Sequence, residues 1–419
     1  MDYLPAEFFT MEDFDLAGKS VFLRIDVNSP INPETGEIIG SSRFFGHVET
    51  INSLVDSRVV ILAHQSRPGK ADFTSLEKHA LTLQRILGRK VEFMDSLFSR
   101  DVLDRIPRLK NGEILMLENT RFYSEETGVD DDLEVMETTN MVRKLSPLMD
   151  YFVNDAFPSI HRSQTTLVGF QRVVPNISGK LIEREIRSLD RFLKGKESPK
   201  IAVLAGSKIN ESISVAKNFL KTGMVDKIMT GGVVANAFLH AKGINIGKKN
   251  RDFIIKNNKN HEELITICKD LLKKYESKIL LPVDCTLNPS GKRLEIGDKV
   301  PDDQIMADIG VDTIVSYMDE IEKAKSIFLN GPMGMYEIED YSIGTSEILT
   351  AIARNRGLKI AGGGHTLSAL EMLGLLKRFD HTSTGGGALI SYLSGDTMPV
   401  LEALKASKKY FDGNTDGKQ

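Results

Sequence analysis

Charged side chains recur beside apolar runs in the first half of the chain. Arg24, Asp26 and Asn28 alternate along one run, so an extended strand would present all three on one face. Arg43 stands where the first predicted helix begins. The other charged or amide residues that follow such runs are His64, Arg67, Asn119, Arg121, Asn154, Asp155, His161 and Arg162. Because guanidinium groups form paired hydrogen bonds with carboxylate and phosphate oxygens, the pattern predicts a site for a small polyanion, with a solvated charged rim as the alternative.

Glycine-rich turns follow the apolar runs of the second half. They are Gly206-Ser207-Lys208, Gly231-Gly232, Gly331-Pro332, 362–366 and 383–387. Glycine lets the backbone approach a ligand, and the amides at the start of a following helix point toward phosphate, so these turns predict a nucleotide site. The chain contains neither G-x-x-x-x-G-K-[ST] nor G-x-G-x-x-G, and it lacks an H-R-D-L loop with D-F-G. These absences argue against a P-loop enzyme, the common dinucleotide fold and a protein kinase.

A polyanion site and a nucleotide site together predict phosphoryl transfer. Positioning and charge stabilisation dominate that chemistry. Arg43 and Lys208 are the predicted catalytic residues, because neither has to exchange a proton. A carboxylate acceptor, with an ordinary pKa of about 4, is ionised at neutral pH and needs no general base.

The elements that must position these residues alternate along the chain. Apolar runs of strand length lie at 21–27, 59–63, 90–94, 113–117, 151–153, 201–204, 227–229, 278–281, 326–329 and 358–360. Between the first two runs, one helix is predicted whose apolar face consists of Phe44, Val48, Ile51, Leu54 and Val55. This alternation predicts an α/β chain with two doubly wound, Rossmann-like domains, each a parallel sheet covered by helices on both faces.

An amphipathic segment separates the two halves. Within 178–193, apolar residues recur at helical spacing among charged ones, and a polar stretch follows at 194–199. We expect an N-terminal domain at 1–177, a hinge helix at 178–193 and a C-terminal domain at 194–390. An ordinary surface helix within one domain is the alternative.

Composition limits the partners and the compartment. The 419 residues include 54 Lys and Arg against 58 Asp and Glu, a net charge of -4, so no overall basic excess favours nucleic acid or an anionic membrane. Cys268 and Cys285 are the only cysteines, which supports neither a disulfide framework nor a zinc site. The N-terminus is acidic, and no apolar run reaches the roughly 18 residues of a membrane helix. We therefore expect a cytoplasmic protein without a membrane or nucleic-acid partner.

Ordered motifs over nearly the whole chain resemble those of phosphoglycerate kinases, in the form expected of archaeal sequences. The matching segments are 24–28, 64–68, 117–122, 154–157, 161–162, 330–332, 362–366 and 383–387. The resemblance implies reversible phosphoryl transfer between ATP and the carboxylate of 3-phosphoglycerate, giving ADP and 1,3-bisphosphoglycerate, with Mg2+. It also implies a hinge-bending monomer whose C-terminal tail, about 391–419, packs on the first domain.

The resemblance also assigns site residues by position. It implies that the phosphoglycerate is bound by Asp26, Val27, Asn28, Arg43, His64, Gln65, Ser66, Arg67, Arg121, His161 and Arg162. It implies that the nucleotide is bound by Gly206, Lys208, Gly231, Asn330, Glu337, Gly362, Gly363, Gly364, His365 and Thr366.

Two positions depart from the pattern of many family members. His365 replaces an aspartate that helps to hold magnesium, so the protein ligands of the metal are unknown. Ser212 replaces a second lysine near the phosphoryl group, four residues after Lys208. The competing functions are a nicotinamide dehydrogenase, which the missing glycine fingerprint disfavours, and a two-lobed anion-binding protein without catalysis.

Overall fold

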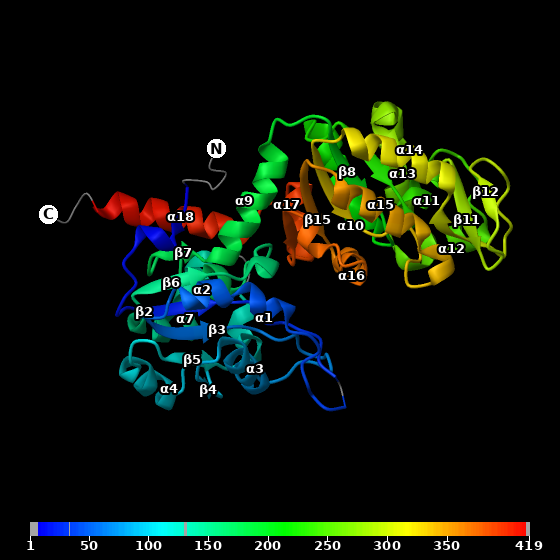
Figure 1. Ribbon diagram of the computed structural model, residues 1–419. Helices are drawn as coiled ribbons and strands as arrows, with labels where there is room; N and C mark the ends of the chain where they lie inside the picture. The colour runs from blue at the N-terminus through cyan, green and yellow to red at the C-terminus, as the bar shows by residue number, and fades with distance from the viewer. Residues whose placement is uncertain (1–6, 33, 130–131, 416–419) are drawn as a thin grey trace. The chain divides into compact units, whose positions relative to one another are not determined.

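The structure is a computed structural model that describes residues 7–32, 34–129 and 132–415. The chain forms two compact units (Figure 1). Unit 1 comprises the described residues of 1–187 and 397–419, and unit 2 comprises 188–396.

Unit 1 is built on a parallel sheet of seven strands in the order β1-β7-β6-β2-β3-β5-β4. The strands are β1 (Phe9–Thr10), β2 (Ser20–Arg24), β3 (Arg58–Leu62), β4 (Val91–Met94), β5 (Ile114–Leu117), β6 (Tyr151–Asn154) and β7 (Asn176–Ser178). Two short strands were not predicted, β1 at the edge of the sheet and β7 between β1 and β6, because neither contains an apolar run of strand length.

Helices cover both faces of this sheet. They are α1 (Ser42–Gly46), α2 (Val48–Asn52), α3 (Glu77–Leu87), α4 (Arg100–Arg105), α5 (Ser124–Thr127), α6 (Leu133–Thr138), α7 (Asn140–Leu145), α8 (Thr165–Val168) and α18 (Pro399–Thr415), with α9 (Lys180–Lys194) continuing into unit 2. Successive strand residues point to opposite faces. Leu23 of β2 therefore packs with Phe44 of α1, whereas Phe22 packs with Leu145 of α7.

Unit 2 repeats the plan with a parallel sheet of six strands in the order β10-β9-β8-β14-β15-β16. The strands are β8 (Lys200–Leu204), β9 (Lys227–Thr230), β10 (Ile279–Leu280), β14 (Ser326–Asn330), β15 (Leu358–Gly362) and β16 (His381–Ser383). The helices are α10 (Ile209–Thr222), α11 (Gly232–Ala241), α12 (Lys248–Asn257), α13 (His261–Tyr275), α14 (Val311–Lys323), α15 (Ile343–Arg354), α16 (Gly364–Met372) and α17 (Gly387–Ser394). Leu329 of β14 packs with Ile348 of α15, and the ring of Phe328 meets that of Phe219 of α10. The predicted two doubly wound α/β domains are thus confirmed.

A small antiparallel sheet in unit 2 was not predicted. Its strands are β12 (Arg293–Glu295), β11 (Asp284–Asn288) and β13 (Ile305–Ile309), in that order. Polar residues interrupt these segments, so none of them reads as a buried parallel strand.

In each parallel sheet, the order in which the chain adds strands reverses at one pair of neighbouring strands. In unit 1 the chain runs outward from β2 through β3 and then returns to place β6 on the other side of β2. In unit 2 the same change occurs between β8 and β14. Ligands of open α/β sheets bind at such points, outside the carboxyl ends of the strands. Residues that follow β2, β3 and β6, and those that follow β8 and β14, are therefore placed to form sites.

One expectation about the helices needs correction. The single helix predicted over 44–55 is two short helices, α1 and α2, because the helix is interrupted at His47, whose imidazole points into the core. The division between the two units falls within α9, after Arg187. Residues 391–394 belong to α17, and the chain returns to unit 1 at Thr397, where α18 lies beside β7 (Figure 1). Among the described helices, none has the length and apolar character needed to cross a membrane.

Candidate active site

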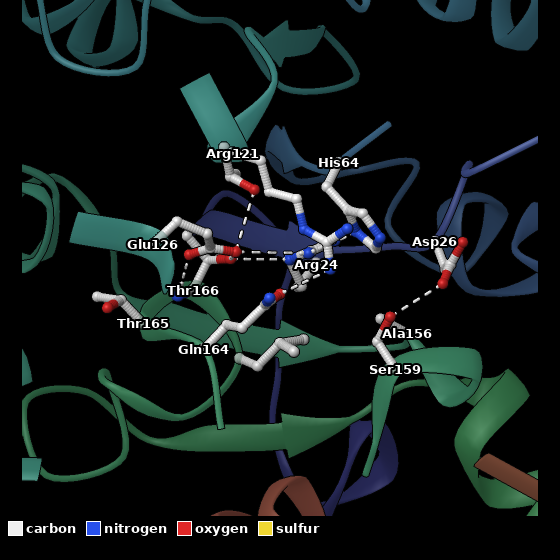
Figure 2. Close-up of polar contacts among 12 residues, drawn as sticks. Arg24, Asp26, His64, Arg121, Glu126, Ala156, Ser159, Gln164, Thr165 and Thr166 are labelled. Atoms are coloured by element: carbon white, nitrogen blue, oxygen red, sulfur yellow. Dashed lines mark hydrogen bonds and ion pairs between the residues drawn. The ribbon is translucent and has the colours of Figure 1, made fainter. Parts of the chain in front are cut away.

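A buried arginine is at the centre of the unit 1 site. Arg24, the last residue of β2, is fully buried, and its Nε donates to Thr166 Oγ1 at 2.9 Å (Figure 2). Its Nη2 lies 3.7 Å from Glu126 Oε1, and Glu126 is equally buried. Because removing a charge from water is costly unless it is paired, this ion pair explains how Arg24 can occupy the interior. Arg24 belongs to the charged pattern that predicts the polyanion site, although the family resemblance did not assign it to the phosphoglycerate, and the sequence carries no signal for Glu126.

Asp26 links the end of β2 to Arg43. Its Oδ1 accepts hydrogen bonds from Arg43 Nη1 at 2.7 Å and from the Asn28 amide at 3.0 Å, and its Oδ2 accepts one from Ser159 at 2.9 Å. Burial, the largest single effect, would raise the pKa of Asp26, but Arg43, the neighbouring His64 and Arg24, and the hydrogen bond from Ser159 together outweigh it and hold that pKa well below its usual value. Asp26 is thus a fixed anion that orients Arg43, which remains about one third exposed at 31%.

His64 is a neutral donor within this positive site. Burial lowers the pKa of His64 well below its usual value, and the charges of Arg24 and Arg121 lower it further, against the opposing effect of Asp26. Its Nδ1 lies 3.0 Å from Arg24 Nη2, which can only donate, so the ring proton is on Nε2. Nε2 is buried and has no hydrogen-bond partner among the described residues. This orphan N–H is available to a ligand oxygen.

The remaining arginines repel one another. Burial lowers the pKa of Arg121 to about 10, and the nearby charges of Arg162 and Arg24 contribute. Burial likewise lowers the pKa of Arg162, with Arg43 and Arg67 adding to the effect and Asp26 opposing it. Arg121 is positioned by hydrogen bonds to the Ser66 carbonyl and to Gln164 Oε1. Since like charges destabilise one another, a bound polyanion would relieve this cluster.

Some residues assigned to the phosphoglycerate have other contacts. The Val27 side chain belongs to the apolar core, so only its backbone could face a ligand. Gln65 is fully buried, and its amide binds Ser29 and His79, which makes it a support for the loop. Ser66 adopts a positive φ of 55° and donates its amide to Asn28 Oδ1 at 2.9 Å.

His161 and Arg67 lie at the edge of this site. His161 is half-buried, and its Nε2 accepts a 3.4 Å hydrogen bond from Arg162 Nε. Burial lowers the pKa of His161, and the charge of Arg162 adds to the effect. The Arg67 side chain is exposed, so it can reach a ligand only from the rim.

A buried pair of His47 and Asp155 connects this site to α9; Asp155 is one of the strand-end residues noted in the sequence, whereas no pattern singled out His47. His47 Nδ1 lies 2.7 Å from Asp155 Oδ2, and its Nε2 is 3.1 Å from both the amide nitrogen and the carbonyl oxygen of Asp26. Asp155 Oδ1 accepts the Leu181 amide at 2.8 Å, in the first turn of α9. The backbone of Asp26 is thus braced against the start of α9 through two buried side chains.

Three helix N-termini surround one cavity in unit 2. The helices α10, α16 and α17 begin there, and the lining includes Lys208, Gly363, Gly364 and Gly386. The first amides of a helix have no partner within it and carry the positive end of its dipole, so the cavity suits phosphate groups. Lys208 is the only lysine or arginine among the described residues of this lining, and its Nζ lies 3.2 Å from Glu211 Oε1.

Glycines at the strand ends permit close backbone approach. At Gly331, where φ is +96°, a Cβ would lie 2.1 Å from the Ala205 carbonyl oxygen. At Gly363, where φ is +91°, a Cβ would lie 2.4 Å from Asn330 Oδ1. Thr366 Oγ1 accepts the Gly331 amide at 2.7 Å and so joins the ends of β14 and α16.

Of the other glycines assigned to the nucleotide, some are packed closely against neighbouring side chains and one faces the open cavity. Gly362 has a packing role in this structure, because a Cβ there would lie 2.0 Å from a Leu389 methyl carbon. Gly231 precedes α11 and faces Met333 closely, and a Cβ at Gly206 would lie 3.2 Å from Pro332. A Cβ at Gly364 would meet no atom within 4 Å, in keeping with its place in the cavity wall.

A second, more apolar cavity of about 300 Å³ adjoins the first. The two share Gly206, Ser207, Pro332 and His365. The other lining residues, most of which sequence analysis missed, are Gly232, Val233, Asn236, Lys249, Asn250, Phe253, Ile305, Met306, Ala307, Gly334, Met335 and Glu337. Many come from α11, α12 and β13 rather than from the ends of the parallel strands, where the sequence motifs lie. Helix α11 is apolar along most of its length, so its sequence does not distinguish the residues that line the cavity from those that pack in the core.

The two departures from the family pattern have structural counterparts. His365 Nδ1 lies 3.7 Å from Glu337 Oε1, and both side chains are exposed at the rim of the apolar cavity. Ser212 is fully buried in α10, and its Oγ has no partner among the described residues. Within the described part of the chain, no three His, Cys, Asp or Glu side chains gather as a metal site.

Comparison with known proteins gives a consistent result. The sequence model for phosphoglycerate kinase matches residues 11–396. Phosphoglycerate kinases from Thermoplasma acidophilum and Thermoplasma volcanium are 60% and 61% identical to this chain over 407 residues, covering 97% of the chain and 100% of each relative. The crystal structure of phosphoglycerate kinase from Pyrococcus horikoshii OT3 has a TM-score of 0.87 at 40% identity, covering 96% of this chain and 100% of that one. The enzyme from Coxiella burnetii gives 0.79 at 29% identity, covering 95% and 98%.

Proposed function

Because the chain belongs to the phosphoglycerate kinase family, we propose which of its residues carry out the family reaction. The chain is a kinase of glycolysis that transfers a phosphoryl group between ATP and 3-phosphoglycerate. In the reaction, a carboxylate oxygen of 3-phosphoglycerate forms a bond to the γ-phosphorus while the bond from that phosphorus to ADP breaks. No proton moves, so the chain needs charges and positions rather than a base.

Unit 1 binds 3-phosphoglycerate. Arg121, Arg162 and Arg67 hold its phosphate group, and Asn28 and the Nε2–H of His64 donate to its remaining oxygens. The observation that carries this assignment is the arginine cluster, whose members lower one another's pKa and whose repulsion an anion would cancel. Gln65, Ser66 and His161 support the residues that bind the phosphoglycerate. Gln65 holds the loop through Ser29, the Ser66 carbonyl accepts a hydrogen bond from Arg121, and His161 accepts one from Arg162.

Unit 2 binds the nucleotide. The phosphates lie against the starts of α10, α16 and α17, near Gly363, Gly364 and Thr366. The ribose lies near Glu337, and the base enters the apolar cavity. Asn330 shapes the phosphate cavity through its contact with Gly363.

Arg43 and Lys208 stabilise the transferring group. Neither charge depends on proton exchange, and each lies in the site that holds one of the two reactants. Asp26 fixes one nitrogen of Arg43, which leaves its other donors for phosphoryl oxygens. Lys208 is 66% exposed and free to swing from Glu211 to a ligand.

Magnesium would arrive with the nucleotide. Mg2+ prefers oxygen ligands and commonly binds substrate phosphates with one or two carboxylates. Among the described residues of the phosphate cavity lining, Glu211 is the one carboxylate, so the donor set fits a metal held mainly by the phosphates. When bound, the metal neutralises negative charge on the phosphate oxygens.

We also propose that the protein is a cytoplasmic monomer. Burial raises the pKa of the Cys268 and Cys285 thiols to about 12, and the two cysteines are free, which suits a reducing compartment.

The test of the catalytic assignment is steady-state kinetics of Arg43→Ala and Lys208→Ala. Loss of a charge that acts mainly in the transition state should lower kcat about 100-fold or more, with smaller changes in the two KM values. Lys248→Ala, at an exposed position outside both cavities, is the matched control. A near-parental kcat in both site variants would refute the assignment.

A further inference from the structure

Asn236 is a buried amide without a hydrogen-bond partner. Its side chain is only 5% exposed, and it lines the apolar cavity of unit 2. Its side-chain amide has no hydrogen-bond partner among the residues that the structure describes, and because it borders the cavity, water can reach it there. A ligand group that hydrogen-bonds to this amide would take the place of that water.

The other polar side chains of this lining are already occupied or solvated. Asn250 donates to the Ile246 and Gln304 carbonyls and accepts the Met306 amide at 3.0 Å, so its amide is fully used. Glu337 and His365 lie near each other at the rim, and Lys249 is exposed to solvent. Asn236 is therefore distinct from Asn250, although both are buried asparagines of the same cavity.

Helix geometry aims Asn236 at the cavity. Gly232, Val233 and Asn236 of α11 all belong to the lining, and positions i, i+1 and i+4 share one face of a helix. Phe253 from α12 and Met335 supply apolar contacts in the same cavity. A flat ring would pack its faces against such side chains and present its polar edge to an amide.

We propose that Asn236 reads the edge of the adenine base and selects it by hydrogen bonding. Oδ1 accepts from the exocyclic amino group, and Nδ2 donates to a neighbouring ring nitrogen; asparagine forms this paired contact with adenine. The proposal rests on the proposed function, because it assumes that the base enters this cavity. It adds a specificity-determining residue that the strand-end motifs do not contain.

The consequence is a preference for the amino group of ATP. A site built to bind a donor rejects an analogue that lacks it, because its own polar group is then left unpaired. Purine riboside triphosphate, which carries hydrogen in place of the amino group, should therefore be a poorer substrate than ATP, by about tenfold or more. In Asn236→Leu the two nucleotides should become equivalent within about twofold, mainly through a loss with ATP.

The experiment compares kcat/KM for ATP and purine riboside triphosphate at saturating 3-phosphoglycerate. It uses the parent, Asn236→Leu, the smaller Asn236→Ala, and Asn257→Leu, which makes the same change at an exposed position outside the cavity. Calorimetric titration with ADP and purine riboside diphosphate gives the same ratio without turnover. An unchanged ratio in both Asn236 variants would overturn the proposal, as would a parent that does not distinguish the two nucleotides.

A failure of the proposed nucleotide site would look different. Gly363→Ala alters the phosphate cavity without touching Asn236, so it should weaken both diphosphates equally if the nucleotide binds there. If Gly363→Ala weakens neither, the nucleotide site itself is wrong. If Gly363→Ala weakens binding of both diphosphates while the Asn236 variants keep the parental ratio, only the proposed recognition of the base by Asn236 is wrong.

Discussion

Arg24 in unit 1 is completely buried, whereas Lys208 in unit 2 exposes 66% of its side chain. The first is held by Glu126, Thr166 and His64, while the ammonium group of the second contacts only Glu211 within the described part of the chain. The unit 1 site is thus assembled from charged side chains that the fold has already paired and oriented. The unit 2 site is assembled mainly from backbone amides at helix starts and from an apolar cavity.

This difference has a physical consequence. Side chains fixed in a network bind a small polyanion with little loss of conformational freedom, but the network makes unit 1 sensitive to any missing charge. Helix termini offer positive potential without buried charge. Unit 2 should therefore tolerate loss of its cation better than unit 1, as far as folding is concerned.

The largest effect should come from breaking the buried pair of unit 1. Arg24→Met leaves the Glu126 carboxylate buried without its cation, which should cost about 3 to 5 kcal/mol of unfolding free energy. Lys208→Met, which removes an exposed cation from unit 2, should change stability by about 0.5 kcal/mol or less. Urea unfolding followed by circular dichroism measures both. Equal losses in the two variants would contradict the comparison.

A ligand contact within the same cluster should have a smaller effect. Arg121→Ala removes a charge proposed to clamp the phosphate of 3-phosphoglycerate in the ground state, so the KM for 3-phosphoglycerate should rise about tenfold or more. The change in kcat should be smaller. Arg67→Ala, at the exposed rim, should raise that KM less, because exposed charges are screened by water. A large fall in kcat with an unchanged KM would place Arg121 among the transition-state contacts instead.

His365 gives a milder test of unit 2. A neutral imidazole is a poor ligand for magnesium, and this ring stands at the rim of both cavities beside Glu337. His365→Ala should therefore raise the KM for ATP several-fold and leave the magnesium dependence of the rate nearly unchanged. Titrations with magnesium at fixed ATP check this, and a large shift in the required magnesium concentration would show that His365 acts on the metal.

The smallest expected effect concerns the protonation of His64. Its pKa is lowered well below the usual value, so the ring stays neutral and takes up no proton as the pH falls from 8 to 6. His64→Gln keeps a neutral donor. The ratio of parent to variant KM for 3-phosphoglycerate should thus be constant across that range, since ionisation of the substrate affects both proteins alike. A ratio that changes around pH 6.5 would mean that His64 titrates in the site.

Much of this architecture could be predicted from the sequence. The apolar runs of β2, β3, β8 and β14 predict parallel strands, and the residues after them predict two candidate sites, because the carboxyl ends of parallel strands meet at one edge of a sheet. Arginines follow the strands of the first half and glycines follow those of the second. This difference predicts that side chains bind an anion in unit 1 and that backbone amides bind phosphate in unit 2.

Other features depend on tertiary structure and could not be predicted. The helical pattern through Phe44 and Ile51 breaks at His47 because that side chain pairs with the distant Asp155. Gln65 lies within a site motif, yet its amide is occupied by Ser29 and His79. The apolar cavity of unit 2 is lined by helix residues such as Asn236, whose spacing equally suits a core face.

The most direct test of the division of labour between the units is a crossed binding experiment. Calorimetry would measure the dissociation constants of 3-phosphoglycerate and ADP, each alone, for the parent, Arg162→Ala and Gly363→Ala. The expected result is that Arg162→Ala weakens 3-phosphoglycerate about tenfold or more with parental ADP binding, and that Gly363→Ala weakens ADP with parental 3-phosphoglycerate binding. If either variant weakened both ligands to the same extent, the assignment of side-chain recognition to unit 1 and backbone recognition to unit 2 would be wrong.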